Sequence, residues 1–153
     1  VIFLGDPKVG KTCILYELFS TVFKAEYIVR KHYTFPLLIC LLATYGVEFA
    51  PLIVKLEEGK TVDVQICDAG GGESSRAMVH SILKTCPMAI VVYDVTGKGN
   101  FMGKYKEIER NSFNNVEKWI ADIKEKAGKD ALIGILANKI DLENRYILYK
   151  RRE

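Results

Sequence analysis

The sequence predicts an α/β fold, with a mostly parallel sheet and helices on both of its faces. Short apolar runs predict strands at residues 1–5, 88–93 and 131–137, as in a buried parallel sheet. Apolar residues recur at helical spacing over residues 12–23 and 112–126, which predicts amphipathic helices between these strands. Strands that alternate with helices indicate a doubly wound sheet, in which ligand sites lie at the carboxyl ends of the strands.

Two further strands are predicted at residues 45–56 and 61–67, joined by a short charged link that contains a glycine. This pattern favours an antiparallel hairpin and therefore one antiparallel strand at the sheet edge. A glycine-rich loop is expected at residues 68–76 and a short helix at 77–85. The polar stretch at 96–111 is expected to form an extended loop.

The composition fits a single domain with a packed core. The chain has 153 residues, of which 49% are apolar and 27% charged, so global disorder is not expected. The net charge of +3 is too small to indicate a nucleic-acid partner. The four cysteines are widely spaced and form no C-x-x-C pair, so we expect reduced thiols, as in a cytosolic protein.

Residues 5–12 read G-D-P-K-V-G-K-T, a full match to the phosphate-loop pattern G-x-x-x-x-G-K-[ST]. Glycines at both fixed positions let successive backbone N–H groups point into one concavity that suits an anion. Lys11 would reach the β- and γ-phosphates of a nucleotide, and the Thr12 hydroxyl would ligate Mg²⁺. The expected phosphate-binding residues are Gly5, Asp6, Pro7, Lys8, Val9, Gly10, Lys11, Thr12 and Cys13.

A second motif, N-K-I-D at residues 138–141, directly follows the strand predicted at 131–137. The Asp141 carboxylate can accept both the ring N–H and the exocyclic amine of guanine, a pair of donors that adenine does not offer. Asn138 can bridge loops, and the stem of Lys139 can cover the plane of the base. The motif therefore predicts guanine as the base.

A third motif, D-x-x-G, begins at Asp68 and ends at Gly71, at the end of a predicted strand. Asp68 would hold a water molecule on Mg²⁺, and the Gly71 N–H would contact the γ-phosphate. All three motifs fall at the carboxyl ends of predicted strands, so we expect them to share one edge of the sheet.

Together these motifs resemble the small Ras-like GTPases, and most closely the Rab branch. Further resemblance lies in Y-G-V-E-F at 45–49, V-Y-D-V-T at 92–96 and S-F-N-N-V-E-K-W-I at 112–120. The resemblance covers residues 1–34, 44–96 and 111–145. It implies the P-loop fold of small G proteins, with GTP or GDP and Mg²⁺ as cofactors.

The resemblance also implies a GTP-binding switch in vesicle-mediated and intracellular protein transport. Effector and exchange-factor proteins would bind residues 24–49 and 68–85. Thr44 would be the switch threonine that binds Mg²⁺ and the γ-phosphate, with Thr34 as the second candidate. The implied metal ligands are thus Thr12, Thr44 and Asp68, and Phe23 would pack against guanine.

The chain departs from the family pattern at the catalytic position. Where the family carries a glutamine that orients the attacking water, this chain has Gly72, which has no side chain. We therefore predict slow hydrolysis, with Lys11 left to stabilise phosphate charge. Pro7 also lacks an N–H, so one potential phosphate donor is absent.

Segments 35–43 and 97–110 look inserted, and one hypothesis is that both are retained intron or misannotated sequence. The family's last strand, last helix and prenylation cysteine are not found, so residues 1–153 are expected to form one G domain that is incomplete at the C-terminus. We expect no membrane anchor in this chain and a cytoplasmic location. An endomembrane surface is expected only if the full-length protein has a prenylated tail.

Three alternatives to a hydrolysing switch remain open. Gly72 favours a nucleotide-binding module that does not hydrolyse GTP. An adenine-specific P-loop enzyme, such as a small kinase, shares the phosphate loop, although the motif at 138–141 argues against it. The inserted segments are also compatible with a truncated or mis-spliced product that has no stable fold.

Overall fold

The computed structural model describes residues 1–25, 44–96 and 111–142, and predictions about Thr34 and residues 35–43 and 97–110 lie outside these ranges. Its elements are β1 (Ile2–Leu4), α1 (Lys11–Ala25), β2 (Val47–Lys55), the 3-10 turn η1 (Glu57–Gly59), β3 (Thr61–Ala69), the 3-10 turn η2 (Glu73–Ser75), α3 (Arg76–Leu83), β4 (Met88–Asp94), α4 (Asn111–Asn114), α5 (Val116–Lys126) and β5 (Leu132–Asn138). Within the described ranges, none of the helices combines the length and the apolar character needed to cross a bilayer.

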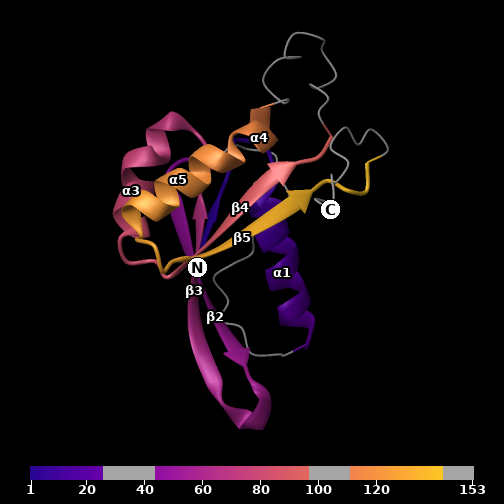
Figure 1. Cartoon of the computed structure of the whole chain (residues 1–153). Helices are drawn as coiled ribbons and strands as arrows, with labels where there is room; N and C mark the ends of the chain where they lie inside the picture. Colours follow the sequence, from indigo (N-terminus) through magenta and orange to yellow (C-terminus); the bar gives the residue numbers. More distant parts are fainter. Residues whose placement is uncertain (26–43, 97–110, 143–153) are drawn as a thin grey trace, which may run out of the picture.

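The five strands form one sheet in the order β2-β3-β1-β4-β5 (Figure 1). β1 pairs in parallel with both β3 and β4, and β4 pairs in parallel with β5. β2 runs antiparallel to β3 over its whole length, from Val47 opposite Ala69 to Lys55 opposite Thr61. The predicted mostly parallel sheet with one antiparallel edge strand is confirmed.

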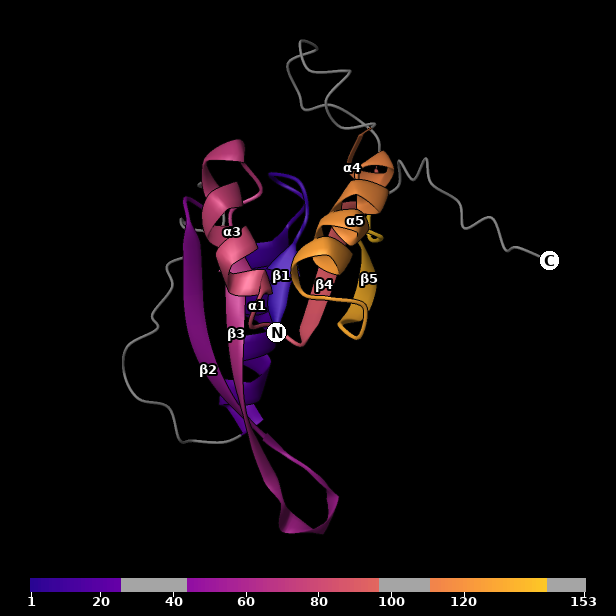
Figure 2. The same cartoon turned by 60° about the vertical axis from the view of Figure 1, so that its left-hand side comes forward.

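Helices cover both faces of the sheet, with α3 and α5 on one face and α1 on the other (Figures 1 and 2). Side chains alternate along β1 accordingly, because successive strand residues point to opposite faces. Ile2 and Leu4 belong to the apolar cluster that includes Val79 of α3 and Trp119 of α5. Phe3 points the other way and belongs to the cluster that includes Leu15 of α1. β1, at the centre of the sheet, is thus buried on both faces, as is typical of a central parallel strand.

Two predictions about element boundaries need correction. The loop expected at 68–76 is shorter, because β3 continues through Ala69 and η2 and α3 occupy the residues from Glu73 onward. The single helix expected at 112–126 is divided into α4 and α5 at Asn115. The Asn115 backbone keeps nearly helical angles (φ −79°, ψ −11°), and its side chain makes a tertiary contact that is described below.

Candidate nucleotide-binding site

The three predicted motifs meet at one edge of the sheet. The phosphate loop leaves the carboxyl end of β1, Asp68 lies near the carboxyl end of β3, and Asn138 is the last residue of β5 (Figure 1). These strands run in parallel through β4, so their carboxyl ends share an edge. The position agrees with the general rule for ligand sites in such sheets.

The phosphate loop needs its two motif glycines for space as well as for conformation. A Cβ on Gly5 would lie 2.1 Å from the carbonyl oxygen of Val92, and one on Gly10 would lie 2.3 Å from Asn138 Nδ2. Both glycines have positive φ, and Lys8 between them also adopts a left-handed conformation (φ 65°). The loop is therefore held close to β4 and to the end of β5, where larger residues would collide.

Lys11 begins α1, and its ammonium group folds back over the loop. Its Nζ donates to the carbonyl oxygens of Gly5 and Asp6, each at 2.9 Å. Burial lowers the pKa of Lys11 to about 8, although the Asp68 and Asp6 carboxylates favour its charged form. A buried cation above a concave loop is an arrangement that an anionic ligand would stabilise further.

Thr12 joins two segments that are distant in the sequence. Its hydroxyl donates to Oδ2 of Asp68 at 2.6 Å and shares a second hydrogen bond of 2.8 Å with the Thr44 hydroxyl. A hydroxyl group has one proton, so Thr44 must be the donor in the second bond. The three predicted metal ligands thus converge, although 32 residues separate Thr12 from Thr44 and 56 separate it from Asp68.

The chemistry of this trio fits Mg²⁺. Two hydroxyls and a carboxylate are hard oxygen donors, which Mg²⁺ prefers. Oδ1 of Asp68 is buried and finds no hydrogen-bond partner among the described residues. Burial also raises the pKa of Asp68, against the opposing effects of the Thr12 hydrogen bond and the Lys11 charge. A cation at this point would satisfy the remaining carboxylate oxygen.

The residues after β5 connect the predicted base site to the rest of the edge. Asn138 Nδ2 donates to the carbonyl of Val9 at 2.7 Å, which joins the phosphate loop to the end of β5. Lys139 forms an ion pair with Asp94 at 2.5 Å, and the other oxygen of Asp94 accepts from the N–H and hydroxyl of Thr96. Asp141 lies in the exposed turn that follows.

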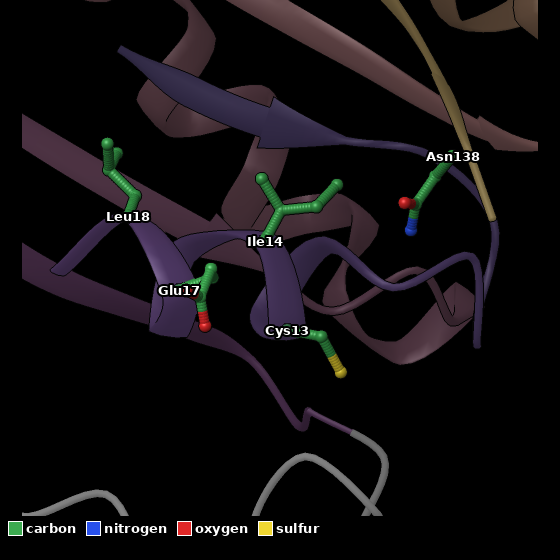
Figure 3. A pocket seen from close by; sticks show the side chains of 5 residues that line it. All are labelled: Cys13, Ile14, Glu17, Leu18 and Asn138. Carbon is green, nitrogen blue, oxygen red and sulfur yellow. The ribbon is translucent and has the colours of Figure 1, made fainter. Parts of the chain in front are cut away.

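An open cavity of about 490 Å³ lies between α1 and the end of β5. Its lining residues are Cys13, Ile14, Glu17, Leu18 and Asn138 (Figure 3). Figure 3 shows the first four along α1 and Asn138 across from them. Phe23 lies further along α1, and its side chain is outside the described part of the structure.

Comparison with known proteins agrees with this geometry. The model of the Ras family matches residues 1–153. The chain belongs to the Ras family. It is similar to a Rab protein, being 29% identical over 152 residues to the Ras-related protein Rab-10 of Caenorhabditis elegans. The match covers 99% of this chain and 62% of that relative, so the chain spans less than two thirds of the relative's length.

The glycines that follow β3 in this Ras-family chain differ in the space around them. A Cβ on Gly71 would lie 2.4–2.5 Å from backbone atoms of Gly5, Asp6 and Pro7, so this residue packs directly on the phosphate loop. A Cβ on Gly72 would meet only Ser74 Oγ, at 3.7 Å. The backbone therefore requires glycine at position 71 but has room for a side chain at 72.

One set of contacts in this Ras-family site could not be found from local sequence. The Asp6 carboxylate accepts hydrogen bonds from Asn115 and Trp119, which lie 109 and 113 residues away. Both donors belong to a segment whose apolar spacing predicts only a packing helix. No spacing rule connects that segment to the phosphate loop.

Proposed function

We propose that this chain binds GTP and GDP with Mg²⁺ and acts as a guanine-nucleotide switch. The observation that best supports the proposal is the convergence of Thr12, Asp68 and Thr44, three oxygen donors from three separate segments. Membership of the Ras family independently implies guanine-nucleotide binding. The base-binding motif at 138–141 lies at the same sheet edge.

Different residues would bind the phosphates, the metal ion and the base. Lys11, now bonded to two loop carbonyls, would donate to the β- and γ-phosphates, and the loop N–H groups would surround their oxygens. Thr12, Thr44 and Asp68 would hold Mg²⁺, which when bound neutralises phosphate charge. Asp141 would accept the two N–H groups of guanine. Residues 24–46 and 68–76 would become ordered around the γ-phosphate and relax when it is lost.

Nucleotide-dependent thermal stabilisation tests this proposal directly. We expect GTP and GDP with Mg²⁺, at about 100 times their dissociation constants, to add about 2.7 kcal/mol to the free energy of unfolding. For a domain of this size that corresponds to roughly 5–10 °C in Tm. The same stabilisation by ATP would favour an adenine-specific enzyme, and the absence of any cooperative transition would favour a product without a stable fold.

A second experiment decides between the two candidates for the switch threonine. Thr44→Ala should weaken binding of a non-hydrolysable GTP analogue by about tenfold, the effect of one lost metal or phosphate contact. GDP affinity should change little, because Thr12 would still bind Mg²⁺. Tyr45→Phe, at an exposed neighbouring position, is the matched control. The same selective loss in Thr34→Ala, with Thr44→Ala unaffected, would assign the role to Thr34 instead.

We further propose that hydrolysis is slow, because Gly72 has no side chain to orient the attacking water. The same observation favours a second candidate function, a nucleotide-dependent binding module that does not hydrolyse GTP. Single-turnover assays with and without a cell extract separate these functions. Turnover that appears only with extract indicates that a partner supplies the water-positioning group.

The resemblance to Rab proteins supports a role in vesicle traffic, with effector and exchange-factor proteins binding residues 24–49 and 68–85. Exposed apolar side chains on this surface include Tyr45, Phe49 and Met78. We propose a cytoplasmic location for the chain, and an endomembrane surface for a longer form with a prenylated tail. Cell fractionation of the full-length protein tests this, because a form without lipid should remain in the cytosolic fraction.

A further inference from the structure

The carboxylate of Asp6, inside the phosphate loop, is held by two donors at the start of α5. Asn115 Nδ2 donates to its Oδ2 at 2.7 Å, and the indole Nε1 of Trp119 donates to its Oδ1 at 3.0 Å. Residues four apart on a helix lie on the same face, so Asn115 and Trp119 reach Asp6 together. Both oxygens of this carboxylate are therefore engaged, one by the residue that precedes α5 and the other by α5 itself. Without these donors the carboxylate would be free to turn toward the phosphate site and repel an anion.

The same tryptophan also contacts the segment that follows β3. Trp119 is 6% exposed, and the guanidinium of Arg76, the first residue of α3, lies 5.9 Å from its ring centroid. Arg76 in turn forms an ion pair of 3.2 Å with Glu73, the residue after Gly72. The edge of one indole ring thus binds the phosphate loop, while its face is covered from the start of α3 (Figure 2 shows α3 beside α5).

Gly71 contacts the loop from the same segment. Its α-carbon lies so close to Gly5, Asp6 and Pro7 that a Cβ there would overlap their backbone atoms. A shift of residues 70–76 would therefore act on the loop through Gly71 and on Trp119 through Arg76. Gly71 contacts the backbone of Asp6, and Trp119 binds the Asp6 side chain.

We propose that Trp119, together with Asn115, is a positioning residue that fixes Asp6 and couples residues 70–76 to the phosphate loop. This inference rests on the proposed nucleotide binding. It adds that the conformation of residues 70–76 affects how fast the phosphate loop releases nucleotide. Trp119 touches no nucleotide atom in this scheme, and its effect passes through Asp6.

The rate of nucleotide release tests whether Trp119 and Asn115 fix Asp6 in the phosphate loop. Trp119→Phe keeps an aromatic ring but removes the N–H, and Asn115→Ala removes the other donor without loss of a helix cap, since the Asn115 side chain makes no capping bond. Each change should accelerate GDP dissociation by about tenfold, the effect of one hydrogen bond to a charged group. In an Asp6→Ala background, Trp119→Phe should change the rate less than twofold, because its partner is gone. Lys118→Gln, at an exposed neighbouring position, should leave the rate unchanged.

Intrinsic fluorescence tests whether Trp119 responds to residues 70–76, since Trp119 is the only tryptophan in the 153 residues. We expect its emission to differ between the GDP form and a form with a non-hydrolysable GTP analogue. Arg76→Gln should remove most of this difference, because the charged group over the ring is lost. Lys118→Gln, on the exposed side of α5, should preserve it.

The outcomes distinguish failure of the proposed nucleotide binding from failure of the positioning role of Trp119 and Asn115. If the wild-type chain is not stabilised by any guanine nucleotide, the proposed function fails and this inference fails with it. If the wild-type chain binds nucleotide but both Trp119→Phe and Asn115→Ala release GDP at the wild-type rate, the inference alone is overturned. It is also overturned if Trp119→Phe acts equally strongly in the Asp6→Ala background, or if Arg76→Gln leaves the emission difference intact.

Discussion

Asp141→Ala should reduce the affinity for GTP and for GDP by at least about a hundredfold. The carboxylate would accept two N–H groups of guanine, and each hydrogen bond to a charged group contributes about 1.5–3 kcal/mol. A loss of that size corresponds to a factor of about ten for every 1.4 kcal/mol. The two nucleotides should be affected equally, because the contact involves the base and not the phosphates. Equilibrium titration with labelled nucleotides measures the change.

ATP binding and a second variant provide the controls for Asp141→Ala. Weak binding of ATP should remain as it is in the wild-type chain, because the phosphate loop is untouched. Asp130→Ala removes an exposed carboxylate in the turn at the opposite end of β5 and should leave all affinities unchanged. An Asp141→Ala variant that still prefers GTP over ATP as strongly as the wild type would assign base recognition to other residues.

Gly72→Gln should increase the single-turnover rate of GTP hydrolysis by about tenfold or more, because it supplies a side-chain amide that can orient the attacking water. The structure accommodates the change. Gly72 has φ −82° and ψ 161°, extended angles that any residue adopts, and an added Cβ would meet only Ser74 Oγ at 3.7 Å. Release of inorganic phosphate from chain preloaded with GTP gives the rate.

Gly72→Ala is the matched control for this gain of activity. It adds the Cβ and restricts the backbone but brings no amide, so hydrolysis should stay within about twofold of the wild-type rate. Both variants should also be more stable by about 0.4–1 kcal/mol, since replacing a glycine at compatible angles restricts the unfolded chain. Equal hydrolysis rates in the two variants would show that water is not positioned from residue 72, and would strengthen the non-hydrolysing alternative.

The sequence predicted the sheet well, and it predicted that the three motifs would lie at one edge of it, because both depend on local patterns. Short apolar runs identified β1, β4 and β5, and the charged link at 57–60 indicated the β2–β3 hairpin. The two corrected boundaries arise where tertiary contacts override local pattern. Asp68 and Ala69 pair with Glu48 and Val47, so the strand continues into the expected loop. Asn115 marks the division between α4 and α5 and turns its side chain to Asp6.

By itself the sequence determined the chemistry that is available at the sheet edge. The phosphate-loop lysine, the candidate metal ligands and the candidate base-binding aspartate each belong to a motif whose spacing is fixed within a few residues, or follow from the family resemblance. Only the tertiary structure decided which distant groups meet. The family resemblance placed Thr44 and Thr12 at one metal ion, and the structure brings their hydroxyls to 2.8 Å, whereas the contact of Trp119 with Asp6 across 113 residues follows from the structure alone. Local spacing reports backbone conformation and which face is apolar, whereas these contacts depend on how α5 and the segment before β2 pack on the sheet.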